Sequence, residues 1–153
     1  MANTKYSSLV SAFFNKIKDY DFIQLDEKTA SEIVISYIPS ACNMFQSCSQ
    51  DLDDRDDILQ EFNYSLSLSN FNTLVNYMCI EHIDSNYLRT TMSLKARLSS
   101  SDFKSLNLQQ QLSKVMELRS MLKSENDQLA INKSYKDSKL FDIVTNRNKA
   151  GVH

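Results

Sequence analysis

The sequence predicts an all-α protein, a small bundle of three to five helices with an acidic loop and an extended C-terminal tail. The chain of 153 residues contains one Gly and one Pro, so the residues that tight hairpin turns require are scarce. Apolar residues recur at the three- and four-residue spacings of a helix face along several segments. With 42% hydrophobic residues, the chain can fill one modest core. We therefore expect one helical domain over 1–131, followed by a tail over 132–153.

Two helices are expected in the first third of the chain. The first covers 7–19, with one apolar face made by Leu9, Val10, Phe13, Phe14 and Ile17. The second follows Asp26, a good N-cap, and Thr29 with Glu32 also has the spacing of a capping box. Its stripe comprises Ile33, Val34, Tyr37, Ile38, Ala41 and Phe45. Pro39 interrupts this stripe, and we expect a kinked helix there rather than the start of a new one.

An acidic segment comes next. Residues 51–62, DLDDRDDILQEF, contain one Arg, Glu61 and five aspartates, namely Asp51, Asp53, Asp54, Asp56 and Asp57. Such crowding of charge disfavours a regular packed element, so we expect an exposed acidic loop. Beyond it, apolar residues alternate with polar ones from Phe62 to Leu68, which is the period of a strand. One short stretch without a partner makes no sheet, and an extended segment is expected.

The central core helix is expected after Ser69 as N-cap. Its buried side would consist of Phe71, Leu74, Val75, Met78 and Ile83, with Tyr87 and Leu88 extending it. Residues 90–105 are serine-rich and weakly periodic, and we expect a loop there with one or two turns of helix. A long helix is then expected from about 106 to 131. Its stripe of Leu108, Leu112, Val115, Leu122 and Leu129 is interrupted by Arg119 and Asn126, which favours packing on the chain's own helices over an intermolecular coiled coil.

The tail is basic and carries one apolar cluster. Residues 132–153 contain five Lys or Arg residues and two Asp residues. The apolar cluster comprises Leu140, Phe141, Ile143 and Val144. This cluster is too short to form a core, and it would be an exposed apolar patch if nothing covered it. The composition of the tail is compatible both with disorder and with binding of a partner. The apolar cluster favours binding.

The candidate chemistry is weak, and we expect neither a catalytic residue nor a metal or other cofactor. Cys42 and Cys48 lie six residues apart without a second pair, whereas structural zinc ligands are normally paired two to four residues apart. The aspartate cluster lacks the central glycine of a calcium loop. Cys79 fits a buried apolar thiol. An enzymatic alternative would require Cys79 and His82 to be exposed together in a cleft.

Net charge and hydropathy point to protein partners. The formal charge of −2 gives no basic field for nucleic acid or an anionic membrane. No run approaches the roughly 20 apolar residues that span a bilayer, and the start MANTKYSSLV does not resemble a signal peptide. With an odd number of cysteines as well, we expect a cytosolic chain when it is made.

These features follow one another in an order that resembles that of a known protein family. An aromatic amphipathic start, Leu25-Asp26-Glu27, the acidic segment, SNFNTLVNYMCIEHI and DFKSLNLQQQLSKVMELRSMLKSENDQLAINKSY follow one another over two-thirds of the chain or more. Together they resemble the head-to-tail connector proteins of the adaptor class in tailed bacteriophages that infect low-GC bacteria. The core helix of similar sequences carries a tryptophan, whereas this chain has none and offers Ile83 nearby.

The resemblance implies a virion structural protein at the neck of the particle. Such proteins form a ring, usually of twelve copies, beneath the portal protein, where they extend the DNA channel and receive a stopper or tail protein. DNA passes through the channel without specific binding. The C-terminal tail usually docks on the portal, and the matching residues here are Tyr135, Leu140, Phe141, Ile143 and Val144. Localisation would be the host cytoplasm during assembly and then the virion neck, with no membrane partner.

A ring needs a heterologous interface, in which one face of a subunit meets a different face of the next. Our hypothesis is that the acidic segment, Asp51 to Asp57, lies at an inter-subunit or partner contact or lines the channel, where negative charge would repel DNA. The alternative function is a helical regulatory or inhibitory protein that binds another phage or host protein through the same surfaces.

Overall fold

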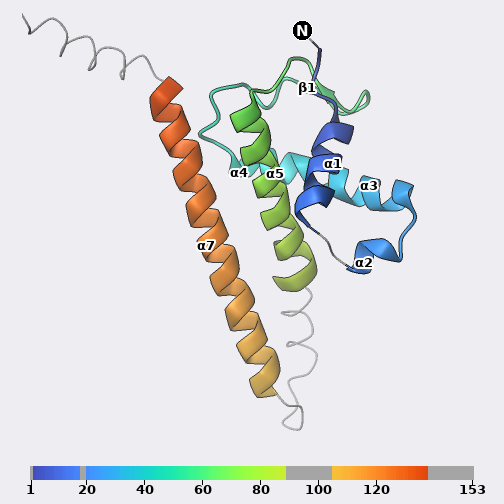
Figure 1. The fold of residues 1–153 in the computed structure, drawn as a ribbon, viewed down its shortest axis with the longest axis vertical. Helices are drawn as coiled ribbons and strands as arrows, with labels where there is room; N and C mark the ends of the chain where they lie inside the picture. The colour runs from blue at the N-terminus through green and yellow to red at the C-terminus, as the bar shows by residue number, and fades with distance from the viewer. Residues whose placement is uncertain (1, 18–19, 89–104, 138–153) are drawn as a thin grey trace, which may run out of the picture.

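The computed structural model describes residues 2–17, 20–88 and 105–137, and this part of the chain is mostly helical, as predicted (Figure 1). The helices are α1 (Tyr6–Lys16), α2 (Tyr20–Ile23), α3 (Glu27–Ile35), α4 (Ile38–Met44), α5 (Leu68–Ile83) and α7 (Ser105–Asp137). A π-helical turn, η1 (Asp84–Leu88), continues α5. Two short strands, β1 (Arg55–Asp56) and β2 (Glu61–Phe62), pair as an antiparallel hairpin. Within the described residues, no helix is long and apolar enough to cross a membrane.

Side-chain caps determine where two helices begin. Asp26 caps α3, because its carboxylate accepts hydrogen bonds from the backbone N–H of Thr29 at 3.2 Å and from the Thr29 hydroxyl at 2.6 Å. Asp26 is the cap that we predicted for this helix. Thr29, the other candidate, lies inside α3 and does not begin it. The same hydrogen bonds hold the pKa of Asp26 below its usual range. At α5 the expected cap was wrong by two positions: Ser67, not Ser69, accepts the N–H of Asn70 at 3.3 Å.

Two expected helix boundaries in the first half are corrected. The first helix ends at Lys16 rather than at residue 19, and a separate short helix, α2, follows. At Pro39 we expected a kink, but α3 ends at Ile35 and a new helix begins at Ile38. Pro39 therefore lies in the first turn of α4, where a backbone N–H has no partner within its own helix and its loss costs little.

Helix α5 is the central element, as predicted. Its residues Leu74, Val75 and Met78 are completely buried, and α5 packs against α1, α4 and α7. Burial extends further around the helix than the single predicted side. Phe71 and Ile83, expected in the core, are half-buried, whereas the following residues outside the predicted side are buried: Asn70, Thr73, Tyr77, Ile80, Glu81 and His82. A helix covered on several sides loses its simple amphipathic pattern.

Helix α7 lies alongside α5 and runs antiparallel to it (Figure 1). It continues to Asp137, past the boundary at residue 131 that we expected between domain and tail. As predicted, it packs on the chain's own body. The expected seam was wrong in detail, because Leu129 is exposed whereas Asn126 and Ala130 are buried. The polar residues that seemed to interrupt the stripe are part of the contact.

Polar contacts set the register of α7 against α5. Arg119 donates from Nε and Nη2 to the two carboxylate oxygens of Asp84, at 2.6 and 2.9 Å. Asn126 donates to the Thr73 carbonyl at 3.3 Å and accepts from Asn76 at 3.1 Å. The Tyr77 hydroxyl donates to Asp127. These bonds have fixed directions, so a shift of α7 by one turn would leave several partly buried groups without partners.

Replacing Arg119 by Leu should lower the free energy of unfolding by about 1–2 kcal/mol, because Asp84 would remain partly buried without its partner. Urea denaturation followed by circular dichroism measures this change. The matched control is Lys123→Leu, which removes the more exposed ion pair with Asp127 within α7. That variant should change stability by less than about 0.5 kcal/mol. Equal effects in the two variants would contradict the proposed role of Arg119.

Candidate interaction surface

The acidic segment is folded, in contrast to the irregular loop that we expected. Its two strands pair with Arg55 opposite Phe62 and Asp56 opposite Glu61, so residues 57–60 form the tip of a hairpin. Phe62 is completely buried and packs edge-on against Tyr6, with ring centroids 5.6 Å apart. Of the stretch from Phe62 to Leu68 that alternates like a strand, Phe62 alone belongs to a strand, and its partner strand lies within the acidic segment itself. This buried aromatic pair ties the hairpin to α1.

The N-terminal segment ahead of α1 holds the hairpin from its other side. The N–H of Phe62 donates to the Thr4 carbonyl at 2.8 Å, and the N–H of Tyr6 donates to the Gln60 carbonyl at 2.8 Å. Thr4 also donates its N–H to the Tyr64 carbonyl at 3.0 Å. These backbone hydrogen bonds therefore join the hairpin and the residues that follow it to the N-terminal segment, and they fix the position of the hairpin on the body.

The tip of the hairpin presents two aliphatic side chains to solvent. Ile58 is 93% exposed and Leu59 is 68% exposed. The Asp56 carboxylate accepts the N–H groups of both residues at 2.9 Å, which fixes the turn. Gln60 has φ of 54°, a left-handed conformation that is uncommon for a residue with a Cβ atom. Two adjacent exposed aliphatic residues on a turn that hydrogen bonds hold in place offer a small apolar contact point to another protein.

The predicted acidic residues come together around this tip. Asp51, Asp53, Asp54 and Asp57 are exposed, and Asp56 is half-buried. Arg55 lies 3.4 Å from Asp53 and 3.4 Å from Asp57. It is the one basic residue beside six acidic residues in 51–61, so this segment carries a net charge of −5. This field favours a partner with positive charge next to its apolar contact.

Hydrogen bonds orient two of these carboxylates. Asp57 accepts from the Tyr6 hydroxyl at 2.6 Å, and Asp54 accepts from the Asn63 side chain at 2.7 Å. Burial, and next the bond to Asp57, raise the pKa of Tyr6 well above its usual value, so this hydroxyl stays a donor. The carboxylates are thus held in place on the surface rather than spread over a mobile loop.

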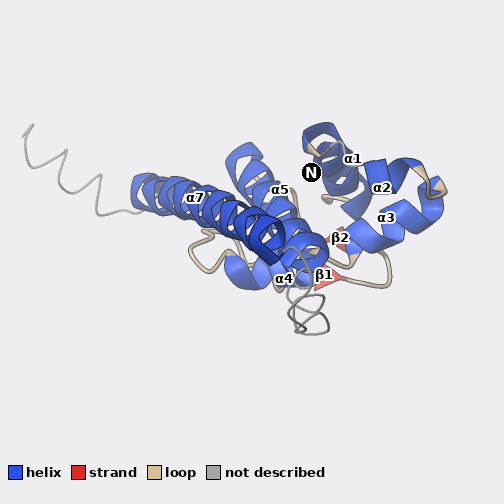
Figure 2. Cartoon of the chain, turned by 90° about the horizontal axis from the view of Figure 1, so that it is seen from below, coloured by secondary structure: helices blue, strands red, loops and turns tan. Residues whose placement is uncertain are grey.

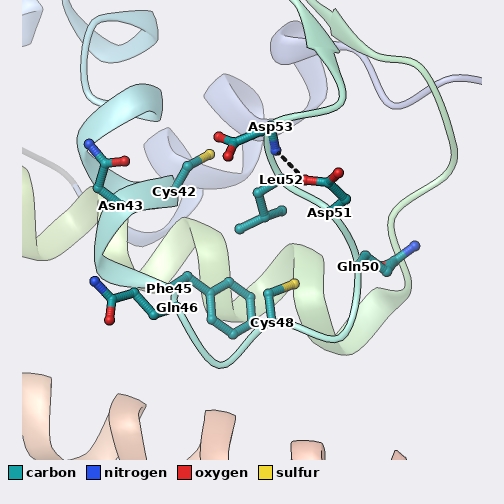
Figure 3. A pocket seen from close by; sticks show the side chains of 9 residues that line it. All are labelled: Cys42, Asn43, Phe45, Gln46, Cys48, Gln50, Asp51, Leu52 and Asp53. Atoms are coloured by element: carbon teal, nitrogen blue, oxygen red, sulfur yellow. Dashed lines mark hydrogen bonds between the residues drawn. The ribbon is translucent and has the colours of Figure 1, made fainter.

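A hollow of about 480 Å³ lies beside the hairpin, between the end of α4 and the segment that leads into β1 (Figure 3). Phe45 and Leu52 form its apolar wall, and Asp51 and Asp53 supply its charge. Cys42 and Cys48 are free thiols there. Burial raises the pKa of Cys42 to about 11, so this thiol is protonated at neutral pH. The chemistry of the hollow suits a cationic or amide side chain of a partner better than it suits nucleophilic attack.

Cys79 and His82 do not form the exposed pair that the enzymatic alternative requires. His82 is 1% exposed and lies among aromatic rings, with Phe13 at 5.6 Å and Phe22 at 5.2 Å between ring centroids. Its Nδ1 atom faces Tyr37 and Asn86. Cys79 is half-buried, and burial raises its pKa to about 11. Among the described residues, no three His, Cys, Asp or Glu side chains gather as metal ligands.

The predicted docking residues of the tail lie almost entirely beyond the described ranges. Tyr135 belongs to α7, and Leu140, Phe141, Ile143 and Val144 lie outside the described residues. The structure adds two residues that sequence reasoning missed, Ile58 and Leu59. Their signal was present, because an apolar pair at the end of an aspartate run is unlike a solvated loop, but the exposure of both became evident only in the folded hairpin.

The Cys79 thiol should react slowly. In a chain with Cys42→Ala and Cys48→Ala, reaction with a disulfide reagent at pH 8 should be roughly a hundredfold slower than in urea, because a pKa near 11 leaves little thiolate. Absorbance of the released thiol measures the rate. A native rate equal to the unfolded rate would show an accessible thiol and would restore the enzymatic alternative.

Comparison with protein-family models, with curated proteins and with solved structures finds no match to this chain.

Proposed function

We propose that this protein joins other protein chains, and that it is a head-to-tail connector of the adaptor class in a tailed bacteriophage. The observation that carries the proposal is the hairpin tip, where Ile58 and Leu59 are held exposed within a surface of net charge −5. A chain that covered these two aliphatic side chains would remove apolar area from water, which is favourable. The resemblance in the order of sequence features supports the more specific connector role.

The placement of the hairpin supports a contact between subunits or with the next protein of the assembly. The hairpin lies at one end of the body, and α2 with the start of α3 lies toward the other end (Figure 1). A protein whose binding features occupy different faces can meet neighbours head to tail, which is the condition for a closed ring. In the proposed ring the aspartates set register and association rate, and the aliphatic tip supplies the buried contact.

The tail supplies the second contact in the proposal. Its basic, apolar segment around Leu140 and Phe141 docks on the portal protein, and the body then offers the hairpin to a neighbouring copy or to the stopper. A segment that orders upon docking loses conformational entropy at that moment, but it can wrap around its partner. Assembly would then begin at the portal, and the ring would close on it.

Electron microscopy of the protein mixed with portal complexes tests the proposed function. We expect added density beneath the portal with the native chain, and loss of that density or of ring closure with the double variant Ile58→Ser, Leu59→Ser. Ile131→Ser is the matched control, because Ile131 is also an exposed aliphatic residue and belongs to α7. A ring that forms equally well with the double variant would remove the role of the hairpin. Failure of the native chain to bind any portal complex would contradict the connector role.

Shortening the chain so that it ends at Lys139 tests the tail separately. Loss of Leu140, Phe141, Ile143 and Val144 should weaken attachment to purified portal complexes at least tenfold, because the apolar docking contact is gone. Surface plasmon resonance measures the affinity, and a chain that ends at Asn148 retains the cluster as a control. Undiminished affinity of the shorter chain would show that the tail is not the docking element.

A further inference from the structure

A second regular stripe runs along α7 beside the face that contacts α5. Positions 114, 118, 121 and 125 are separated by four, three and four residues, so they fall within an arc of about 60° on the helix. Leu118 is 46% exposed and Met121 is 52% exposed, and Lys114 and Glu125 beside them are exposed. This is the spacing of a coiled-coil seam with an apolar centre and one charge of each sign at its ends.

The stripe is separate from the face that holds α7 to the body. The body-facing positions are Arg119, Leu122, Asn126 and Ala130, which contact α5 and η1. At 100° per residue, the centre of the stripe is turned by about 115° from the centre of these four positions. Helix α7 lies at the outer edge of the described part of the chain, with α1, α2 and α3 on the far side of α5 (Figure 2). A second helix can therefore approach the stripe without displacing α5.

The charges on the stripe of one copy complement those on the stripe of a second copy. If a second copy of α7 runs antiparallel about a two-fold axis between residues 119 and 120, Leu118 of each copy meets Met121 of the other. The same rotation places Lys114 of each copy opposite Glu125 of the other, at both ends of the apolar centre. A parallel arrangement in register would place each charge opposite its own kind, which is unfavourable.

We propose that two copies of this chain associate through this stripe as an antiparallel pair of α7 helices. This contact goes beyond the proposed connector function, because it is isologous and uses neither the hairpin nor the tail. The apolar centre is small, so the dimer belongs to the weak, concentration-dependent class of interfaces. Each exposed Lys–Glu pair contributes little alone, and the two symmetric pairs select the antiparallel register.

Analytical ultracentrifugation of the full chain over a range of concentrations tests the proposal. The native chain should pass from monomer to dimer as concentration rises. Lys114→Glu and Glu125→Lys should each weaken dimerisation roughly tenfold, because each change replaces both attractive pairs by repulsive ones. The double variant with the two charges exchanged should restore dimerisation. Such recovery requires that the two positions face each other.

Matched controls separate this contact from a general effect of charge. Lys28→Glu and Glu32→Lys make the same changes at exposed positions of α3 and should leave dimerisation unchanged. Circular dichroism checks that each variant keeps its helical content. A native chain that stays monomeric at all concentrations, or a charge exchange that restores nothing, overturns the proposal. An intact dimer that fails to bind portal complexes would instead contradict the connector function alone.

Discussion

Burial of α5 is the constraint on which the rest of the structure depends. This helix packs against α1, α4 and α7, and its residues Leu74 and Met78 are fully enclosed. A helix with apolar residues on several sides is stable in water only when other elements cover each side. The short helices of the first half and the long final helix are therefore arranged by the same requirement, although they are far apart in the sequence.

The two coverings of α5 differ in chemistry. Helices α1 and α4 supply apolar side chains such as Phe13 and Ile38. Helix α7 supplies hydrogen bonds as well, through Arg119, Asn126 and Asp127. Apolar packing provides most of the stabilisation, whereas directional polar contacts select one register among several of similar apolar burial. The result is a long helix in a defined position, with its outer surface available to other chains.

The surfaces that we assign to assembly share a physical logic. In the hairpin and on α7, exposed aliphatic residues stand next to charges that would be costly to bury in the wrong pairing. The apolar residues supply affinity, and the charges restrict partner and register. The hairpin is held by backbone bonds to residues 4–6, so its aliphatic tip needs little ordering when a partner covers it.

The sequence by itself determined the helical class, the central place of α5, the long final helix and the Asp26 cap, because periodicity and capping are local properties. It also indicated that most aspartates of the acidic segment would be exposed. Only tertiary structure decided that Phe62 would find a partner strand, that Arg119 and Asn126 would lie inside a contact, and that Ile58 would be exposed. Each of these depends on which distant group lies opposite, and a polar residue in a helical stripe reads as an interruption until its partner on another helix is known.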